Sequence, residues 1–142
     1  INGLRFWGSP WQPWFMNWAF NLLRGEQLRE RWGQIPHNTD VLVTHGPPHG
    51  VLDQVRPRPE STRFRERIGS GPLGCDELRK RISEIRPSLH VFGHIHDSHG
   101  TTTKDSTIFA NASICGEGCR PNQAAIVVDA ILRNGQWAFE VV

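Results

Sequence analysis

Two short apolar runs, each closed by histidine and glycine, stand out in the hydrophobic pattern of the chain. Residues 41–43 (VLV) lead into Thr-His-Gly at 44–46, and residues 89–92 (LHVF) lead into Gly-His-Ile-His at 93–96. Apolar runs of this length, bounded by turn residues, are typical of buried strands. Between them, apolar positions recur at spacings of three and four over 75–85, which predicts a helix.

The rest of the pattern predicts one further helix and several strands. Residues 26–32 are expected to form one or two helical turns that end before Gly33 and Pro36. Asn134-Gly135 is the dipeptide most typical of a tight hairpin turn. Further strands are expected at 1–7, 106–110, 124–130 and 136–142. The sequence therefore predicts an α/β fold with no internal repeat and no clear linker.

The order strand, helix, strand places the two histidine motifs together. This order gives a parallel strand pair with a right-handed crossover, and parallel neighbours end at the same sheet edge. Ligands of open α/β sheets bind beyond that edge. In extended backbone, residues two apart point to one side, so His94 and His96 should face His45 while Ile95 turns into the core. Neutral imidazoles in this arrangement favour a site for a divalent metal.

Each histidine also has a simpler interpretation. His45 taken alone is more typical of a hydrogen-bonded structural residue, and the metal interpretation depends on the three histidines converging. His90 lies within the strand and is expected in the core or on a sheet face. His49 is expected in a loop, from which it could donate to a bound phosphate.

Composition narrows the classes of function. The net charge of +2 is too small to indicate a nucleic-acid partner, although arginine suits phosphate. Three cysteines in 142 residues argue against a secreted disulfide scaffold. No segment has the roughly 20 apolar residues of a membrane span, and no signal peptide is visible. A cytoplasmic protein that acts away from membranes is expected.

Four lesser signals stay open at the level of the sequence. Asn111 could orient a ligand or a metal-bound histidine, or it could form a local turn. The arginines between Arg56 and Arg67 could form a lid over phosphate, although a solvated loop is the simpler interpretation. Cys115 and Cys119 could form a metal clip or a disulfide, or have no special role. The aromatic residues of segment 7–20 favour core or pocket-wall packing over base stacking.

Taken together, the motifs resemble the calcineurin-like metallophosphoesterases. THGPP and FGHIH look like the last two motifs of that family. GSPWQPWF, WAFNL, RPSLHVFGHIHDSHG and ANASIC extend the resemblance to the metallophosphoesterase-domain-containing subgroup, which is similar to class III cyclic nucleotide phosphodiesterases. The resemblance covers the chain from about Gly3 to Val128. It implies a four-layer α/β/β/α sandwich, of which residues 1–142 would be the C-terminal half.

The resemblance also implies a chemistry. His45 and His94 would bind the second of two divalent metal ions and His96 the first, the ions being Mn, Fe, Zn or Mg. The substrate would be a phosphoester, in particular a phosphodiester and as one candidate a cyclic nucleotide. The family carries Asp-x-His, Gly-Asp and Gly-Asn-His motifs ahead of these two, and none precedes them here.

The missing motifs leave more than one function open. The histidine that would act as general acid is among the missing residues, so the sequence offers no certain catalytic residue. The chain is therefore expected to be a piece of a longer enzyme. The alternatives are a non-catalytic metal-binding fragment or pseudo-enzyme, and an interaction module.

Overall fold

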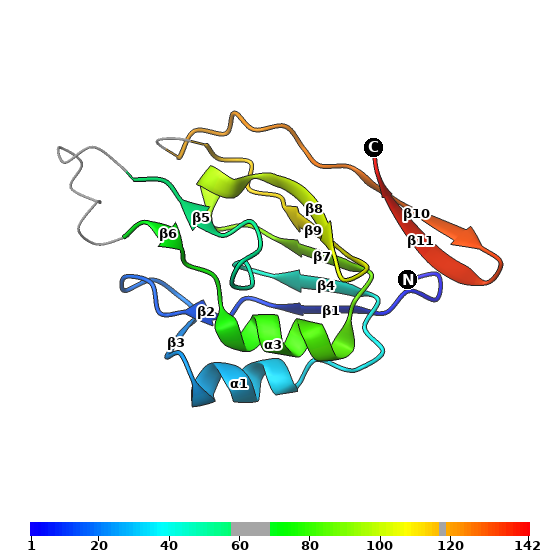
Figure 1. Ribbon diagram of the computed structural model, residues 1–142, viewed down its shortest axis with the longest axis horizontal. Coiled ribbons are helices and arrows are strands. Elements are labelled where there is room, and N and C mark those ends of the chain that lie inside the picture. The colour runs from blue at the N-terminus through cyan, green and yellow to red at the C-terminus, as the bar shows by residue number, and fades with distance from the viewer. Residues whose placement is uncertain (58–68, 117–118) are drawn as a thin grey trace.

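A five-stranded sheet forms the centre of the molecule, in a computed structural model that describes residues 1–57, 69–116 and 119–142 (Figure 1). Its strand order is β1-β4-β7-β9-β8, in which the first four strands are parallel and β8 is antiparallel to β9. The strands are β1 (Phe6–Ser9), β4 (Val41–Thr44), β7 (Leu89–Phe92), β9 (Thr107–Asn111) and β8 (Gly100–Lys104).

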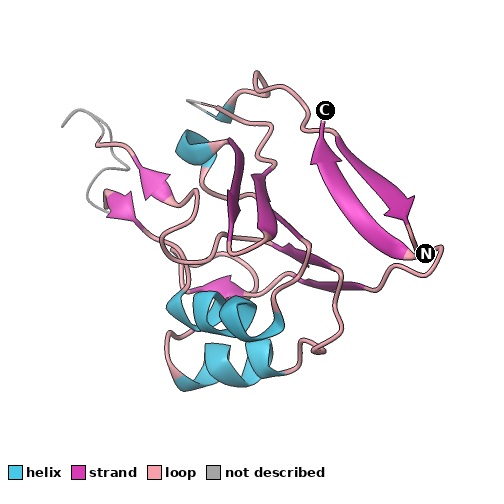
Figure 2. Cartoon of the chain, turned by 45° about the vertical axis from the view of Figure 1, so that its right-hand side comes forward, coloured by secondary structure: helices cyan, strands magenta, loops and turns pink. Residues whose placement is uncertain are grey.

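Two helices, α1 (Glu26–Gly33) and α3 (Asp76–Ile85), lie side by side on one face of this sheet (Figures 1 and 2). The apolar side of α3 is buried, as its spacing of apolar residues requires. The Cys75 thiol caps its first turn by accepting from the Leu78 N–H, and Arg86 ends it in a left-handed conformation. The main core residues are Leu28, Trp32, Ile35, Leu42, Leu78, Ile82, Phe92 and Phe109.

Small paired elements surround the sheet. Strands β2 (Gln12–Pro13) and β3 (Asn21–Leu22), which come early in the sequence, pair with each other, and β5 (Gln54–Val55) pairs with β6 (Gly71–Pro72). Strands β10 (Val128–Arg133) and β11 (Gln136–Val141) form the C-terminal hairpin, in which Asn134 and Gly135 take positive φ angles of 51° and 78°. One 3-10 turn, η1 (His96–Ser98), follows β7.

The α/β prediction is confirmed, and so are the helix at 75–85, the parallel pair of strands around it and the hairpin turn. The strand expected at 124–130 starts only at Val128. The strand Gly100–Lys104 was not predicted, because its threonine-rich sequence lacks an apolar run and its residues are largely exposed. The four-layer sandwich stays a prediction.

The sheet face turned away from the helices is apolar and partly open. Leu42 points to the helices and is fully buried, so its neighbour Val43 points to the opposite face. Val43 is 43% exposed there, and Phe6, which pairs with Val41, is 50% exposed.

None of the described helices is long and apolar enough to cross a membrane.

Candidate metal centre

His45 and His94 meet beyond the ends of two neighbouring strands. His45 follows β4 and His94 follows β7, and these parallel strands end at the same sheet edge (Figure 1). The Nε2 of His45 lies 3.0 Å from the Nδ1 of His94. The Gly93 N–H donates to the His45 carbonyl at 3.0 Å and ties the two strand ends together. The convergence predicted for this pair is confirmed.

The backbone at His94 differs from the prediction of extended geometry. His94 has a φ of 69°, in the left-handed region, and His96 begins η1. The chain turns sharply here because it must leave the sheet edge within one residue of Gly93. Ile95 is buried as predicted. The expectation that alternation along a strand would align His94 with His96 is therefore wrong, and the two imidazoles are placed by a turn.

Both paired imidazoles are neutral at neutral pH. Burial lowers the pKa of His94 to about 4, with smaller contributions from the neighbouring His45 and His96. Burial also lowers the pKa of His45. The neutral ring is the form that binds metals. The two imidazole nitrogens, 3.0 Å apart, could both serve one divalent ion as ligands.

The third predicted ligand stands apart from this pair. His96 lies near enough to lower the pKa of His94, yet no three His, Cys, Asp or Glu side chains form a metal-binding group within residues 1–57, 69–116 and 119–142. The described site thus offers two ligands in contact. The role of His96 as a ligand of the first metal stays a prediction.

A buried series of hydrogen bonds holds the backbone next to His45. His90 is fully buried, as predicted, and burial lowers its pKa to about 3. Its Nε2 lies 2.8 Å from the Thr44 Oγ1, which itself donates to the Gly46 carbonyl at 2.8 Å. Since that hydroxyl proton is already used, His90 must donate through its Nε2. These hydrogen bonds fix Thr44 and Gly46, the residues on both sides of His45.

Asn111 is a buried support of the same loop. Its Nδ2 donates to the Ile95 carbonyl at 2.8 Å and to the Leu52 carbonyl at 3.2 Å, and its Oδ1 accepts from Ser113. These bonds fix the peptide between His94 and His96. Contact of Asn111 with a ligand stays a prediction, and its described contacts give it a positioning role.

His49 lies near the start of α3. Its Nδ1 is 3.4 Å from the Asp76 carboxylate, and its backbone N–H donates to the Cys75 carbonyl. The side chain is 44% exposed, so it is accessible to a ligand from solvent. Donation from His49 to a bound phosphate stays a prediction.

Two described carboxylates near the histidine loops accept hydrogen bonds from backbone N–H groups. Asp53 is buried and accepts from the N–H groups of Gly50 and Gly74. Asp97 accepts from the Arg56 N–H at 3.0 Å. The letters Asp-x-His do occur at 97–99, but after the Gly-His-x-His motif rather than before it.

Two of the lesser signals in the sequence are the cysteine pair and the arginine-rich segment. Cys115 and Cys119 are both free thiols, so the disulfide considered for them is not formed. The arginine-rich segment lies almost entirely outside the described residues, because 58–68 are not described.

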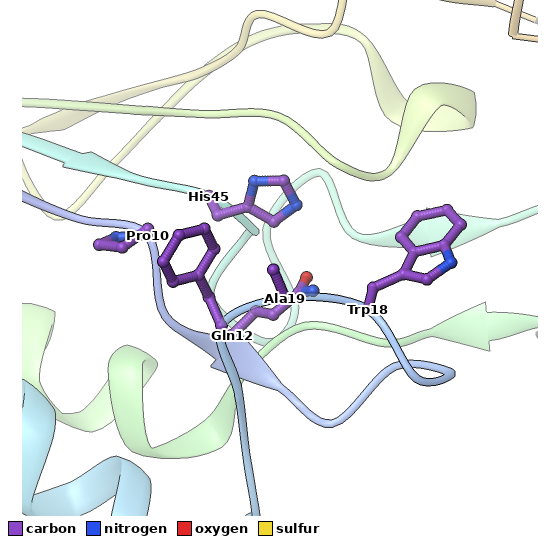
Figure 3. A pocket seen from close by; sticks show the side chains of 6 residues that line it. Pro10, Gln12, Trp18, Ala19 and His45 are labelled. Carbon is purple, nitrogen blue, oxygen red and sulfur yellow. The ribbon is translucent and has the colours of Figure 1, made fainter.

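Aromatic side chains from the N-terminal loop border the histidine pair. The Phe15 ring meets the His94 ring edge-on at 4.9 Å between centroids and the Trp18 ring at 5.1 Å. A pocket of about 160 Å³ lies beside His45 (Figure 3).

Core or pocket-wall packing was predicted for the aromatics of segment 7–20. Trp7 and Trp11 pack against the core, and Trp18 and Phe20 line the pocket although more than half of each is exposed. Trp14 is 59% exposed and does not line this pocket, so the prediction is wrong for it. The position of Trp18 and Phe20 beside His45 was missed, since no local signal connects residue 18 to residue 45.

Comparison with known proteins gives relatives that align with most of this chain but with only part of their own length. No protein-family model matches the chain. Human metallophosphoesterase domain-containing protein 1 is 42% identical over 130 residues, which are 91% of this chain and 36% of that protein. UPF0046 protein T07D4.2 of Caenorhabditis elegans is 39% identical over 128 residues, or 89% of this chain and 29% of that protein. The chain thus spans about a third of the length of these relatives. Over the residues that align, it belongs to the family of the metallophosphoesterase domain-containing proteins.

Proposed function

We propose that this chain supplies part of a metal centre that hydrolyses phosphoesters, and phosphodiesters in particular. The observation that carries the proposal is the contact of two neutral histidines at the ends of adjacent parallel strands. The name of the human and mouse relatives, metallophosphoesterase domain-containing protein 1, supports it. Cyclic nucleotides are the first class of phosphodiester to test.

His45 and His94 would hold one divalent ion through Nε2 and Nδ1, and His96 would serve a second ion. Such ions, when bound, polarise phosphoryl oxygens and lower the pKa of bound water. Mn, Fe, Zn and Mg are all compatible with imidazole or oxygen ligands. The His90–Thr44 bond would keep the His45 backbone in place, and Phe15 would exclude water from one side of His94. The remaining ligands would come from the three motifs that the family carries ahead of these two and that do not precede them here.

A second candidate function is metal binding without hydrolysis. It is favoured by the lack of a third ligand in contact with the pair among the described residues. Such a site could still hold a zinc ion if His96 joined the pair, since three histidines suffice for one zinc ion with an open position.

The test compares His94→Ala with His37→Ala, which removes an exposed histidine of a distant loop. Metal content is measured after manganese or zinc supply, and so is hydrolysis of bis(p-nitrophenyl) phosphate, both on a longer protein in which this chain is joined to the three preceding motifs. We expect His94→Ala to lose at least tenfold in metal affinity and in rate, while His37→Ala matches the wild type. Equal metal content and rate in both variants would exclude the proposal. Metal bound by the wild type without hydrolysis would favour the second candidate.

A further inference from the structure

The pocket beside His45 has the size of one aromatic ring. Its volume is about 160 Å³, and an engineered protein cavity of about 150 Å³ is known to bind benzene. It is lined by Pro10, Gln12, Trp18, Ala19, Phe20 and His45. Trp18 and Phe20 remain 59% and 53% exposed, which leaves large apolar surfaces available to a ligand.

Gln12 adds a buried hydrogen-bond acceptor that lacks a partner. The residue is only 3% exposed, and among the described residues none donates to its Oε1. Its Nε2 donates to the Asn21 Oδ1 at 3.3 Å. That Asn21 oxygen is identified because the Phe15 backbone N–H also donates to it. The free atom of Gln12 is therefore its carbonyl oxygen, and a ligand N–H or O–H would satisfy it.

The loop that carries Trp18 is held in shape by hydrogen bonds within the protein, before any ligand binds. The Asn21 Nδ2 donates to the carbonyls of Phe15, Met16 and Trp18 at 3.2–3.3 Å for the first two and 2.9 Å for the third. Met16 and Phe20 take left-handed φ angles of 50° and 61°. Non-glycine residues in this region are strained and often mark functional sites. A site that is already shaped binds with less loss of entropy.

We propose that this pocket binds a planar aromatic ring of the phosphoester, and that a donor group on the ring bonds the Gln12 carbonyl. The inference rests on the proposed function: His45 lines the pocket (Figure 3), and it would also hold the metal ion that binds the phosphoryl group. Trp18 and Phe20 supply faces for stacking. The substrate class is thus phosphoesters with an aromatic substituent, in preference to aliphatic ones of the same size.

Three non-hydrolysable probes test this preference: phenylphosphonate, 4-aminophenylphosphonate and cyclohexylphosphonate. Their dissociation constants are measured by titration calorimetry on the full chain with manganese. We expect phenylphosphonate to bind about tenfold more tightly than cyclohexylphosphonate, from the stacking of one ring on aromatic side chains. The amino probe should bind more tightly still, because it can donate to Gln12. Equal affinity for the phenyl and cyclohexyl probes, or no saturable binding of phenylphosphonate, would overturn the inference.

Trp18→Ala and Trp14→Ala form a matched pair of variants. Both tryptophans lie in the same loop and are 59% exposed, but Trp14 does not line the pocket. Trp18→Ala should lose about tenfold in phenylphosphonate affinity and leave the cyclohexyl probe unchanged. Trp14→Ala should change neither. Equal losses in the two variants would contradict the assignment of the ring site to this pocket.

Gln12→Met tests the donor contact. It should abolish the extra affinity of the amino probe and keep the preference for phenyl over cyclohexyl. An amino probe that keeps its advantage in this variant would remove Gln12 from the proposal.

The failure of this inference can be told from the failure of the proposed function. Hydrolysis that depends on His94 but shows no aromatic preference would overturn only the ring site. Aromatic preference that depends on Trp18, without hydrolysis or bound metal, would overturn only the phosphoesterase.

Discussion

At the scale of single residues, the identity of the site histidines could be predicted but their backbone could not. His45 and His94 follow apolar runs, and that pattern is visible in the sequence. The left-handed φ of 69° at His94 is not, because it arises from the tight exit of the chain from β7 and from the Asn111 bond to Ile95. A histidine in this conformation is strained, which fits a residue kept for its ring.

This strain gives a prediction for two variants of one position. His94→Gly and His94→Ala both remove the imidazole, but only glycine takes positive φ without a steric cost. We expect His94→Gly to be more stable than His94→Ala by about 1 kcal/mol in urea unfolding. An alanine variant as stable as the glycine variant would show that the turn relaxes.

The Arg5–Asp40 pair gives a pH-dependent prediction. The Asp40 carboxylate accepts from the Arg5 backbone N–H at 2.8 Å, from Nε at 2.9 Å and from an η nitrogen at 3.0 Å. The side-chain bonds lower the pKa of Asp40. A lowered pKa adds stability that is present above the unfolded value near 4 and is lost as the pH falls through the folded value.

We therefore expect Asp40→Asn to be less stable than the wild type at pH 7. The expected loss in the free energy of unfolding is only about 1 kcal/mol, because the pair is partly exposed to solvent. The difference should shrink below about pH 4. Urea unfolding at pH 7, 5 and 3 measures it. A constant difference over this range would mean that the charge of Asp40 is not responsible.

At the scale of elements, α3 was predicted within one residue, whereas the threonine-rich β8 was missed. Helix α3 has regular apolar spacing and a proline soon after it, so its sequence alone defines it. Strand β8 is defined by its pairing with β9, which no local pattern of apolar residues reveals. Its Thr101–Thr103 side chains suit a half-exposed edge strand.

The cap of α3 makes one cysteine chemically distinct. Cys75 is 1% exposed, and its thiol accepts from the Trp32 indole N–H and the Leu78 N–H. Burial raises the pKa of Cys75 to about 11. At pH 8, only roughly one part in a thousand of this thiol is ionised, and the thiolate is the reactive form.

A thiol reagent such as DTNB should therefore modify the exposed Cys119 quickly and Cys75 only upon unfolding. Mass spectrometry of peptides after timed labelling at pH 8 measures this order. Cys119→Ser serves as the control, since it should remove the label on Cys119 and leave the labelling of Cys75 unchanged. Fast labelling of Cys75 in the folded chain would contradict the buried cap.

At the scale of the whole molecule, the α/β class and the meeting of His45 with His94 could be predicted from the alternation of strands and helices. The aromatic pocket could not, because it depends on how the N-terminal loop returns to the sheet edge. The exposed side of the sheet follows from the register of β1 and β4, which places Phe6 and Val43 on the face without helices.

This apolar face should make the 142-residue chain self-associate. Exposed apolar sheet surfaces favour contacts between molecules. We expect Phe6→Thr combined with Val43→Thr to lower the concentration-dependent mass seen by light scattering after size exclusion. Val127→Thr changes a valine that is 53% exposed in a loop and should have no effect. Equal masses for all three chains would show that this face is not the contact surface.

The pairing of His45 with His94 also links the site to folding kinetics. The two residues are 49 positions apart in the chain, and contacts between distant residues form late because loop closure costs entropy. Local turns such as the C-terminal hairpin can form within microseconds, but the histidine pair requires β4 and β7 to be aligned around α3. A newly made chain would thus acquire the proposed metal affinity only as its sheet closes.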